Sequence, residues 1–279
     1  MDIMAAIHQR FSVRSYADRP VEPALRERVM ECSENADRVT PIRPRVALIK
    51  GREAVDRVLT FMIGSYGLVR NAPYLLAGIL PEESERARID LGYVMEQAVL
   101  EATRLGLGTC WITGTYDAQR AGDAVSMGPD EMVAAVCALG HPTEEGFGRL
   151  HTKLIRRLAG GHKRKALTSI VYSENWKEPW SPEDADPALV TILNHARLAP
   201  SAHNAQPWRF IVRPGALALA VVKPMFIDAG IVMSHVSLAA EAADRQGEWA
   251  LRLRDDALAR EYSLPERAIP VATFSFPGS

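Results

Sequence analysis

The stretch DLGYVMEQAVLEATRLGLGTCW at residues 90–111 is matched, without a gap, by DAGIVMSHVSLAAEAADRQGEW at residues 228–249. Most of the identical positions recur at steps of three or four residues, which predicts that they share one buried face of a long helix. An offset of 138 residues therefore relates two parts of this chain. The identities are Asp90/Asp228, Gly92/Gly230, Val94/Val232, Met95/Met233, Leu100/Leu238, Ala102/Ala240 and Trp111/Trp249.

Other matches keep the same order along the chain. Residues 23–25 (PAL) match 187–189 at an offset of 164, and the strand-like segments 45–49 (RVALI) and 209–213 (RFIVR) follow at that offset. VCALGHP, ending at Pro142, and VATFSFP, ending at Pro277, each predict a core strand. We infer an internal duplication, although two amphipathic helices can also look alike by chance.

The predicted halves are unequal. The first spans residues 1–180 and the second spans residues 181–279, and the second lacks about 26 residues between its first strand and its long helix. The boundary falls in EPWSPEDADP at residues 178–187, where prolines and acidic residues interrupt regular structure.

The composition limits the classes of function. With 279 residues and 47% hydrophobic content, the chain can bury a sizeable core. Its 33 Lys and Arg balance 34 Asp and Glu, which argues against nucleic acid or an anionic membrane as the main partner. Three widely spaced cysteines without CxxC spacing argue against a disulfide framework or a thiolate metal site. With no signal-like N-terminus or membrane-spanning stretch, we expect a cytoplasmic protein.

Two segments carry candidate chemistry. In RFSVR at residues 10–14, two arginines flank Ser12 after a short helical pattern at 3–7, as in a phosphate clamp, although alone the segment also fits a solvated basic turn. LAPSAHNAQPWRF at residues 198–210 lies between a predicted helix at 189–197 and a strand. Its prolines and short amides can reach the edge of a flat heterocycle, whereas Trp208 is expected to pack in the core.

Other chemistries find little support. Gly106 and Gly108 follow a helix rather than a strand, which predicts a helix cap and not a dinucleotide-binding turn. Ser201 and His203 lack a GxSxG context, and the seven histidines are scattered, so neither a hydrolase triad nor a metal site is indicated. Cys110, beside Trp111, is expected to be buried packing rather than a nucleophile.

Taken together, several motifs resemble the FMN-dependent nitroreductase family: residues 10–14, 90–117, 136–142, 164–176 and 199–208. The resemblance implies an α+β fold, a three-layer sandwich with a mainly antiparallel sheet and helices on both faces, here in two related halves. Family members are usually homodimers with flavins at the subunit interface. One subunit supplies the RSxR segment, the strand after the long helix and the late basic segment, and the other supplies the PSxxN loop.

This sequence departs from that pattern in a complementary way. The first half has the phosphate-side motifs, but at the position of PSxxN it has ADRVT at residues 36–40. The second half has Pro200, Ser201 and Asn204, yet no RSxR segment precedes its first helix. We therefore expect a fused, monomeric pseudo-dimer with one complete flavin site and one degenerate site.

The resemblance assigns the site by position. The phosphate would be held by the 10–14 segment and the basic residues near 164, the ring would lie against the PSxxN loop, and the backbone at 112–114 would approach the flavin N5, where Gly114 permits close contact. Gln206 alternatively only braces the loop. The cofactor-binding positions carried over are Arg10, Ser12, Val13, Arg14, Ile112, Thr113, Gly114, Lys163, Arg164, Lys165, Pro200, Ser201, Ala202, Asn204 and Gln206.

The implied activity is an FMN-dependent oxidoreductase that passes hydride from NAD(P)H to a small acceptor, of nitroaromatic or quinone type, by a ping-pong mechanism. No side chain is assigned as a catalytic acid or base. The alternatives are a non-catalytic flavin-binding or regulatory protein on the same fold, and reductive chemistry on a specific metabolite.

Overall fold

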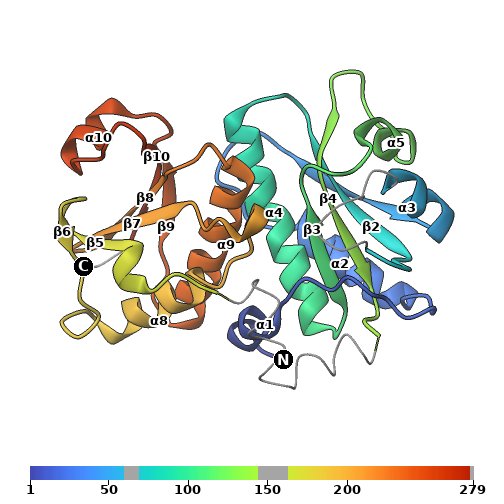
Figure 1. Cartoon of the computed structure of the whole chain (residues 1–279), viewed down its shortest axis with the longest axis horizontal. Coiled ribbons are helices and arrows are strands. Elements are labelled where there is room, and N and C mark those ends of the chain that lie inside the picture. Colours follow the sequence, from blue (N-terminus) through green and yellow to red (C-terminus); the bar gives the residue numbers. More distant parts are fainter. Residues whose placement is uncertain (60–68, 144–162, 277–279) are drawn as a thin grey trace.

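A computed structural model describes residues 1–59, 69–143 and 163–276. In this part of the chain, one sheet has the strand order β1-β2-β4-β3 and the other has the order β6-β5-β7-β8-β10-β9. Every neighbouring pair is antiparallel except β5 and β7. The sheets lie on opposite sides of the molecule, with helices α4 and α9 between them (Figure 1). The predicted α+β class with mainly antiparallel strands is confirmed.

The first sheet and its helices come from the N-terminal part of the chain. Strand β2 is buried at every residue because the sheet is covered on both faces, which explains its continuous apolar sequence YLLAGIL. The elements are α1 Ile3–Gln9, α2 Pro23–Glu34, β1 Arg45–Lys50, α3 Arg52–Val58, β2 Tyr74–Leu80, α4 Glu85–Arg104, β3 Gly108–Ile112, α5 Ala118–Asp123 and β4 Met132–Gly140.

The second sheet repeats the strand order of the first, since β7-β8-β10-β9 corresponds to β1-β2-β4-β3. The matching helices α2 and α8 both begin with proline, a residue that suits the first helical turn. The elements are η1 Leu167–Ser169, β5 Val171–Ser173, β6 Glu178–Pro179, α8 Pro187–Ala196, η2 Ala202–Asn204, β7 Trp208–Arg213, β8 Ala216–Val221, α9 Phe226–Ala242, β9 Glu248–Leu251, α10 Asp256–Glu261 and β10 Ile269–Ser275.

Helices α4 and α9 contact each other through two glycines. A Cβ atom on Gly92 would collide with the Ile227 carbonyl oxygen, and one on Gly230 would collide with the Ile89 carbonyl oxygen. Residues 89 and 227, like 92 and 230, are 138 positions apart, so the contact is reciprocal. Glycine at both positions lets the two backbones approach closely. This symmetry supports the inferred duplication.

The prediction of one buried face for these helices was too narrow. Residues 89–96 of α4 and 226–236 of α9 are buried without interruption. Each helix packs against its partner helix and also belongs to the large core shared with the sheets, so no face is left to solvent over these stretches. The matching tryptophans, Trp111 and Trp249, lie on strands β3 and β9 rather than on the helices.

The tail of the first predicted half joins the sheet of the second. Strand β5 pairs in parallel with β7, with Val171 opposite Phe210, and β6 pairs with β5 at the edge of that sheet. Chain segments on both sides of residue 180 therefore build one sheet.

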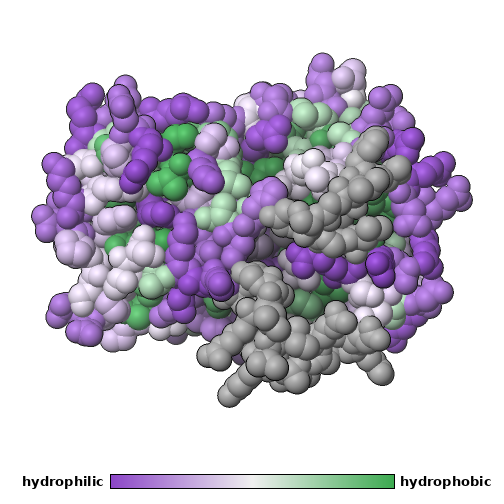
Figure 2. Space-filling model, in the orientation of Figure 1, coloured by the Kyte–Doolittle hydropathy of each residue, from purple (hydrophilic) through white to green (hydrophobic). Residues whose placement is uncertain are grey.

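Local signals behave as the sequence predicts. Helix α4 ends with Gly106 at φ +76°, while Gly106 and Leu107 donate to the carbonyls of Thr103 and Ala102, which is a Schellman cap. Trp208 is fully buried, as expected. Hydrophilic residues dominate the face shown in Figure 2, with hydrophobic residues visible in separate areas. Among the described helices, none combines the length and apolar character that crossing a membrane requires.

Candidate functional site

The RFSVR segment lies along strand β3. Helix α1 ends at Gln9, with Arg10 as its C-cap. The Val13 amide donates to the Thr109 carbonyl at 2.8 Å, next to a bridge between Ser12 and Thr109. A Cβ atom on Gly108 would lie 2.7 Å from a Val13 methyl carbon, so glycine at 108 allows the segment to approach the strand. The N-terminal candidate residues are thereby fixed beside the strand that leads to residues 112–114.

Residues 112–114 lie at the C-terminal end of strand β3, where the backbone reaches the surface. Ile112 is buried, whereas Thr113 and Gly114 are exposed. A Cβ atom on Gly114 would meet no atom within 4 Å among the described residues, and Gly114 has no positive φ. Neither packing nor backbone conformation therefore requires glycine at this position, which leaves open space for another molecule.

The loop after α8 is held in an unusual conformation. His203, Asn204 and Gln206 have φ values of 53°, 52° and 48°, in the left-handed region that non-glycine residues seldom adopt. The Ser201 hydroxyl accepts from the Gln206 amide at 3.0 Å, and the Asp228 carboxylate accepts from the Ala202 amide at 3.1 Å. The loop is thus anchored to the start of α9.

The late basic segment of the first predicted half meets this loop directly. Arg164 donates from Nη1 to Asn204 Oδ1 and from Nη2 to the Leu198 carbonyl, both at 2.8 Å. The Asn204 side-chain amide donates to the Lys163 carbonyl at 3.1 Å. Lys165 Nζ donates to the backbone carbonyls of residues 205 and 206, each at 3.0 Å. The structure therefore joins two groups of candidate residues that are about 40 positions apart in sequence.

Gln206 braces this junction. Its Oε1 accepts from the Lys165 amide at 2.8 Å, and its Nε2 donates to the Lys163 carbonyl at 3.0 Å. The side chain is buried, with 3% of its surface exposed. Of the two roles considered for Gln206, the structure shows the bracing role, and contact with a cofactor stays a prediction.

Three arginines gather positive charge at the junction. Burial is the main cause that lowers the pKa of Arg164 to about 10, and repulsion from Arg10 and Arg197 adds to it. Nε and Nη1 of Arg10 and Nε of Arg197 are buried and find no hydrogen-bond acceptor among the described residues. Buried cationic donors without acceptors are costly, and an anion with several oxygens would satisfy them. The phosphate-side residues thus fit an anionic group.

The remaining N-terminal candidates differ in exposure: Arg14 is exposed, Ser12 is half-buried and Val13 is buried. The Arg14 side chain is exposed, and its carbonyl accepts from the Arg70 amide at 2.9 Å. Cys110, on β3, lies close enough to Arg10 and Arg14 for their charges to act on it, yet burial raises the pKa of its thiol. Cys110 is 6% exposed and therefore packs in the interior, as the sequence predicts.

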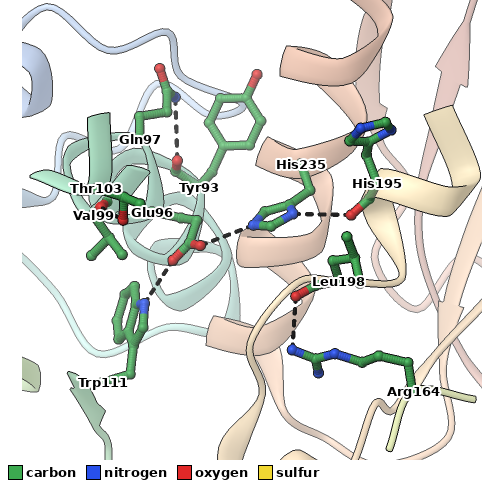
Figure 3. Close-up of polar contacts among 10 residues, drawn as sticks. All are labelled: Tyr93, Glu96, Gln97, Val99, Thr103, Trp111, Arg164, His195, Leu198 and His235. Carbon is green, nitrogen blue, oxygen red and sulfur yellow. Dashed lines mark hydrogen bonds and ion pairs between the residues drawn. The ribbon is translucent and has the colours of Figure 1, made fainter. Parts of the chain in front are cut away.

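A buried hydrogen-bond chain links the end of β3 to the end of α8 (Figure 3). Trp111 Nε1 donates to Glu96 Oε2 at 2.7 Å, and Glu96 Oε1 lies 2.9 Å from His235 Nε2. His235 Nδ1 lies 3.2 Å from the His195 carbonyl oxygen. Glu96 and His235 have no exposed surface. These hydrogen bonds connect α4 of the first predicted half with α8 and α9 of the second.

The equivalent place in the first predicted half holds different residues. There the Asp90 carboxylate accepts from the Val39 amide at 2.9 Å and from the Thr40 hydroxyl at 3.1 Å. Asp90 corresponds to Asp228 at the offset of 138, so the same carboxylate anchors a different loop on each side. Burial raises the pKa of both carboxyls, and raises that of Asp228 to about 7.

With this geometry in place, comparisons with known proteins define the family. Residues 2–240 match the family described as "Putative TM nitroreductase". The chain belongs to this nitroreductase family. A crystal structure described as a putative nitroreductase from Thermotoga maritima aligns with 99% of this nitroreductase-family chain and 94% of its own, at 23% identity and a TM-score of 0.62, which shows a shared fold.

Two further similarities cover about half of the nitroreductase-family chain. A "Putative NADH dehydrogenase/NAD(P)H nitroreductase" of Methanothermobacter thermautotrophicus is 27% identical over 156 residues, which are 52% of this chain and 79% of the relative. A nitroreductase with bound FMN from Bacteroides fragilis aligns with 52% of this chain and 90% of its own, at 18% identity and a TM-score of 0.44.

The sequence analysis missed several residues of this region. Arg197 directly precedes the loop, and a cation at that place was a usable signal. Glu96 and His235 are polar residues within the buried stretches of the matching helices, and a buried polar residue needs a hydrogen-bond partner. Neither residue is identical to its counterpart in the other half, since Glu96 aligns with Ser234 and His235 with Gln97.

Proposed function

We propose that this chain binds one FMN between its two halves and works as an NAD(P)H-dependent oxidoreductase that reduces a small acceptor of nitroaromatic or quinone type. The observation that carries this proposal is the junction of the basic segment 163–165 with loop 200–206. In this family the corresponding segments come from two subunits, whereas here one chain supplies both.

The phosphate end of the proposed site rests on positive charge. The charges of Arg10 and Arg197 act on Arg164, and Arg10 and Arg197 retain buried donors without acceptors among the described residues. Arg10, Ser12 and Arg14, with the Val13 backbone between them, would hold the phosphate, with Arg164 and the neighbouring Lys163 and Lys165 adding positive charge. Arginine suits this role because its planar fork binds two phosphate oxygens together.

For the end of the proposed site that would hold the flavin ring, the supporting observation is the conformation of the backbone. Pro200, Ser201, Ala202 and Asn204 would line one side, because their loop is already held in a strained and fixed conformation. The backbone of residues 112–114 would line the other, with the open space at Gly114 allowing close approach. A site held by its own hydrogen bonds loses little freedom when a ligand enters.

FMN, when bound, would supply the hydride chemistry, accepting from NAD(P)H and delivering to the acceptor in a ping-pong cycle. The name of the Methanothermobacter relative, which includes NAD(P)H, supports this choice of donor. The residues of the chain would bind and orient the cofactor, and no side chain is proposed as a catalytic acid or base.

We further propose that the chain is monomeric and that the second pseudo-equivalent site is degenerate. Residues 36–40 stand where the loop motif would be, and their Val39 amide and Thr40 hydroxyl are bonded to Asp90. Light scattering after size exclusion tests the monomer. Flavin quantified per chain in the purified protein tests the site count: one FMN per chain is expected, and two would contradict a degenerate second site.

Turnover distinguishes the enzyme from a flavin-binding protein without activity. The flavin-loaded protein should oxidise NADPH in the presence of a nitroaromatic or quinone, at a rate that depends on the acceptor. A protein that holds FMN but shows no acceptor-dependent oxidation of NADPH or NADH would refute the oxidoreductase and favour a binding or regulatory role.

Asn204→Ala and Thr40→Ala form a matched pair for the location of the site. Asn204 bonds to Arg164 and Lys163, whereas Thr40 is its counterpart at an offset of 164 and bonds to Asp90. We expect Asn204→Ala to weaken FMN binding and Thr40→Ala to leave it unchanged, measured by quenching of flavin fluorescence. Equal losses would refute the asymmetry.

A further inference from the structure

Glu96 and His235 form a fully buried titratable pair between α4 and α9 (Figure 3). Glu96 Oε1 and His235 Nε2 are 2.9 Å apart. Because the His195 carbonyl can only accept, the 3.2 Å contact to His235 Nδ1 requires a proton on Nδ1. His235 Nε2 then faces the Glu96 carboxyl group, so the two buried side chains form one hydrogen-bonded unit.

The pair connects two segments of the proposed ligand site. On one side, Glu96 accepts from Trp111, the residue directly before Ile112. On the other side, His235 donates to His195 in the last turn of α8, and three residues later the Leu198 carbonyl accepts from Arg164. Continuous hydrogen bonds thus run from the end of β3 to the start of the loop.

The opposite side of the helix pair lacks this connection. At the offset of 138, Ser234 corresponds to Glu96, and Gln97 corresponds to His235. The Ser234 hydroxyl is buried and finds no partner among the described residues, and Gln97 bonds to the Tyr93 carbonyl of its own helix. The pair is therefore present only on the side where the cofactor motifs are retained.

Anchoring a tryptophan does not by itself require a titratable pair. On the opposite side, Trp249 Nε1 donates to the Ser237 hydroxyl at 3.0 Å, which lies 3.0 Å from the Tyr93 hydroxyl. Those neutral groups connect β9 with α4. A buried ion pair is also often no more stabilising than apolar packing. Neither the overall stability of the protein nor the anchoring of Trp111 therefore explains why the titratable pair of Glu96 and His235 is buried at this place.

We propose that Glu96 and His235 are positioning residues of the ligand site, which hold the end of β3 and the end of α8 at a fixed separation so that residues 112–114 and loop 200–206 can contact one ligand. The identity of that ligand as FMN rests on the proposed function, while the positioning of the two segments does not. Both residues act through Trp111 and His195 rather than by contact with the ligand.

The double substitution Glu96→Ser with His235→Gln copies the opposite side of the helix pair, which this fold already accommodates. In the full-length protein without flavin, amide hydrogen exchange should become faster in both segments, 111–114 and 198–206. Glu96→Gln is the conservative variant: its side chain can accept from Trp111 and donate to His235, so exchange should stay at the parent rate. Ser234→Ala, on the opposite side, is the matched control and should change neither segment.

FMN titration gives the second measurement. The double variant should bind FMN at least about tenfold more weakly than the parent, and Glu96→Gln should bind within about threefold, since preorganisation of the site is lost only in the former. Unchanged exchange in both segments, or a Glu96→Gln variant as impaired as the double variant, would overturn the proposal. A parent protein that binds no FMN would refute the proposed function, and the exchange rates would still decide the positioning role.

If the double variant does not fold, His235→Gln alone provides the test. It leaves Glu96 with Trp111 and removes the link to His195, so exchange should rise in 198–206 but not in 111–114. An equal rise in both segments, or in neither, would overturn the proposed connection.

Discussion

The substitution Asp228→Asn should make this protein more stable at pH 8 while having far less effect near pH 4. The Asp228 carboxyl lies beneath the candidate loop, is 3% exposed and accepts from the Ala202 amide. Burial is the main cause that raises its pKa to about 7 from 3.8. Asparagine keeps an oxygen that can accept from Ala202 and removes the buried charge.

The direction of this pH effect follows from the protonation of the Asp228 carboxyl in the folded and the unfolded chain. Well below pH 3.8, the folded and the unfolded carboxyl both hold the proton. Between about pH 4 and pH 7, the unfolded chain releases its proton while the folded chain keeps it, so the stability of the parent falls as the pH rises. A pKa that rises from 3.8 to about 7 corresponds to about 4 kcal/mol in the free energy of unfolding, at about 1.4 kcal/mol per pH unit. That loss is complete by pH 8, and asparagine avoids it.

Urea unfolding of the flavin-free protein at pH 4.5 and pH 8 measures this difference. The free-energy change caused by Asp228→Asn should be more stabilising at pH 8 by about 3–4 kcal/mol. Asp90→Asn is the matched control, and its pH difference should be smaller because Asp90 has two hydrogen-bond donors, Val39 and Thr40. The same effect of Asp228→Asn at both pH values would refute the reasoning.

Three other predictions concern the helix contact and the ligand site. Gly92→Ala and Gly230→Ala should each destabilise the protein by about 3 kcal/mol in denaturant unfolding, because each added methyl group would collide with the backbone of the opposite helix. Clearly unequal effects of the two substitutions would contradict the reciprocal contact. Arg10→Ala should weaken FMN binding by about 1–3 kcal/mol in a fluorescence titration, and unchanged affinity would contradict the phosphate assignment. Gly114→Ala should leave stability unchanged because a Cβ there meets none of the described residues within 4 Å. It should nevertheless reduce FMN affinity about tenfold, and unaltered binding would remove Gly114 from the site.

Much of the framework could be predicted from sequence because its signals are local. The prolines of residues 23 and 187, the strand-like segments around 45 and 209, and the glycine after α4 each mark an element that the structure contains. The buried faces were less predictable. A helix enclosed on every side has no polar stripe, so periodicity alone understated how much of α4 and α9 is buried.

The polar connections of the site could not be predicted because they join residues that are distant in sequence. Arg164 and Asn204 were each selected from motifs, but their hydrogen bond appears only in the folded chain. Glu96 and His235 are 139 positions apart and differ from their counterparts in the other half, so a search for matching residues passes over them. Polar residues that interrupt the apolar positions of the matching helices are the feature of the sequence that points to such connections.

Strand β5 has a consequence for how the chain can be divided. By pairing with β7, it covers an edge of the second sheet with a strand that the first predicted half supplies. A fragment that begins at residue 181 would leave the backbone groups of β7 unpaired and open to association with other chains. The second half expressed alone should therefore aggregate, unless the first half is present to donate β5 and complete the sheet in trans.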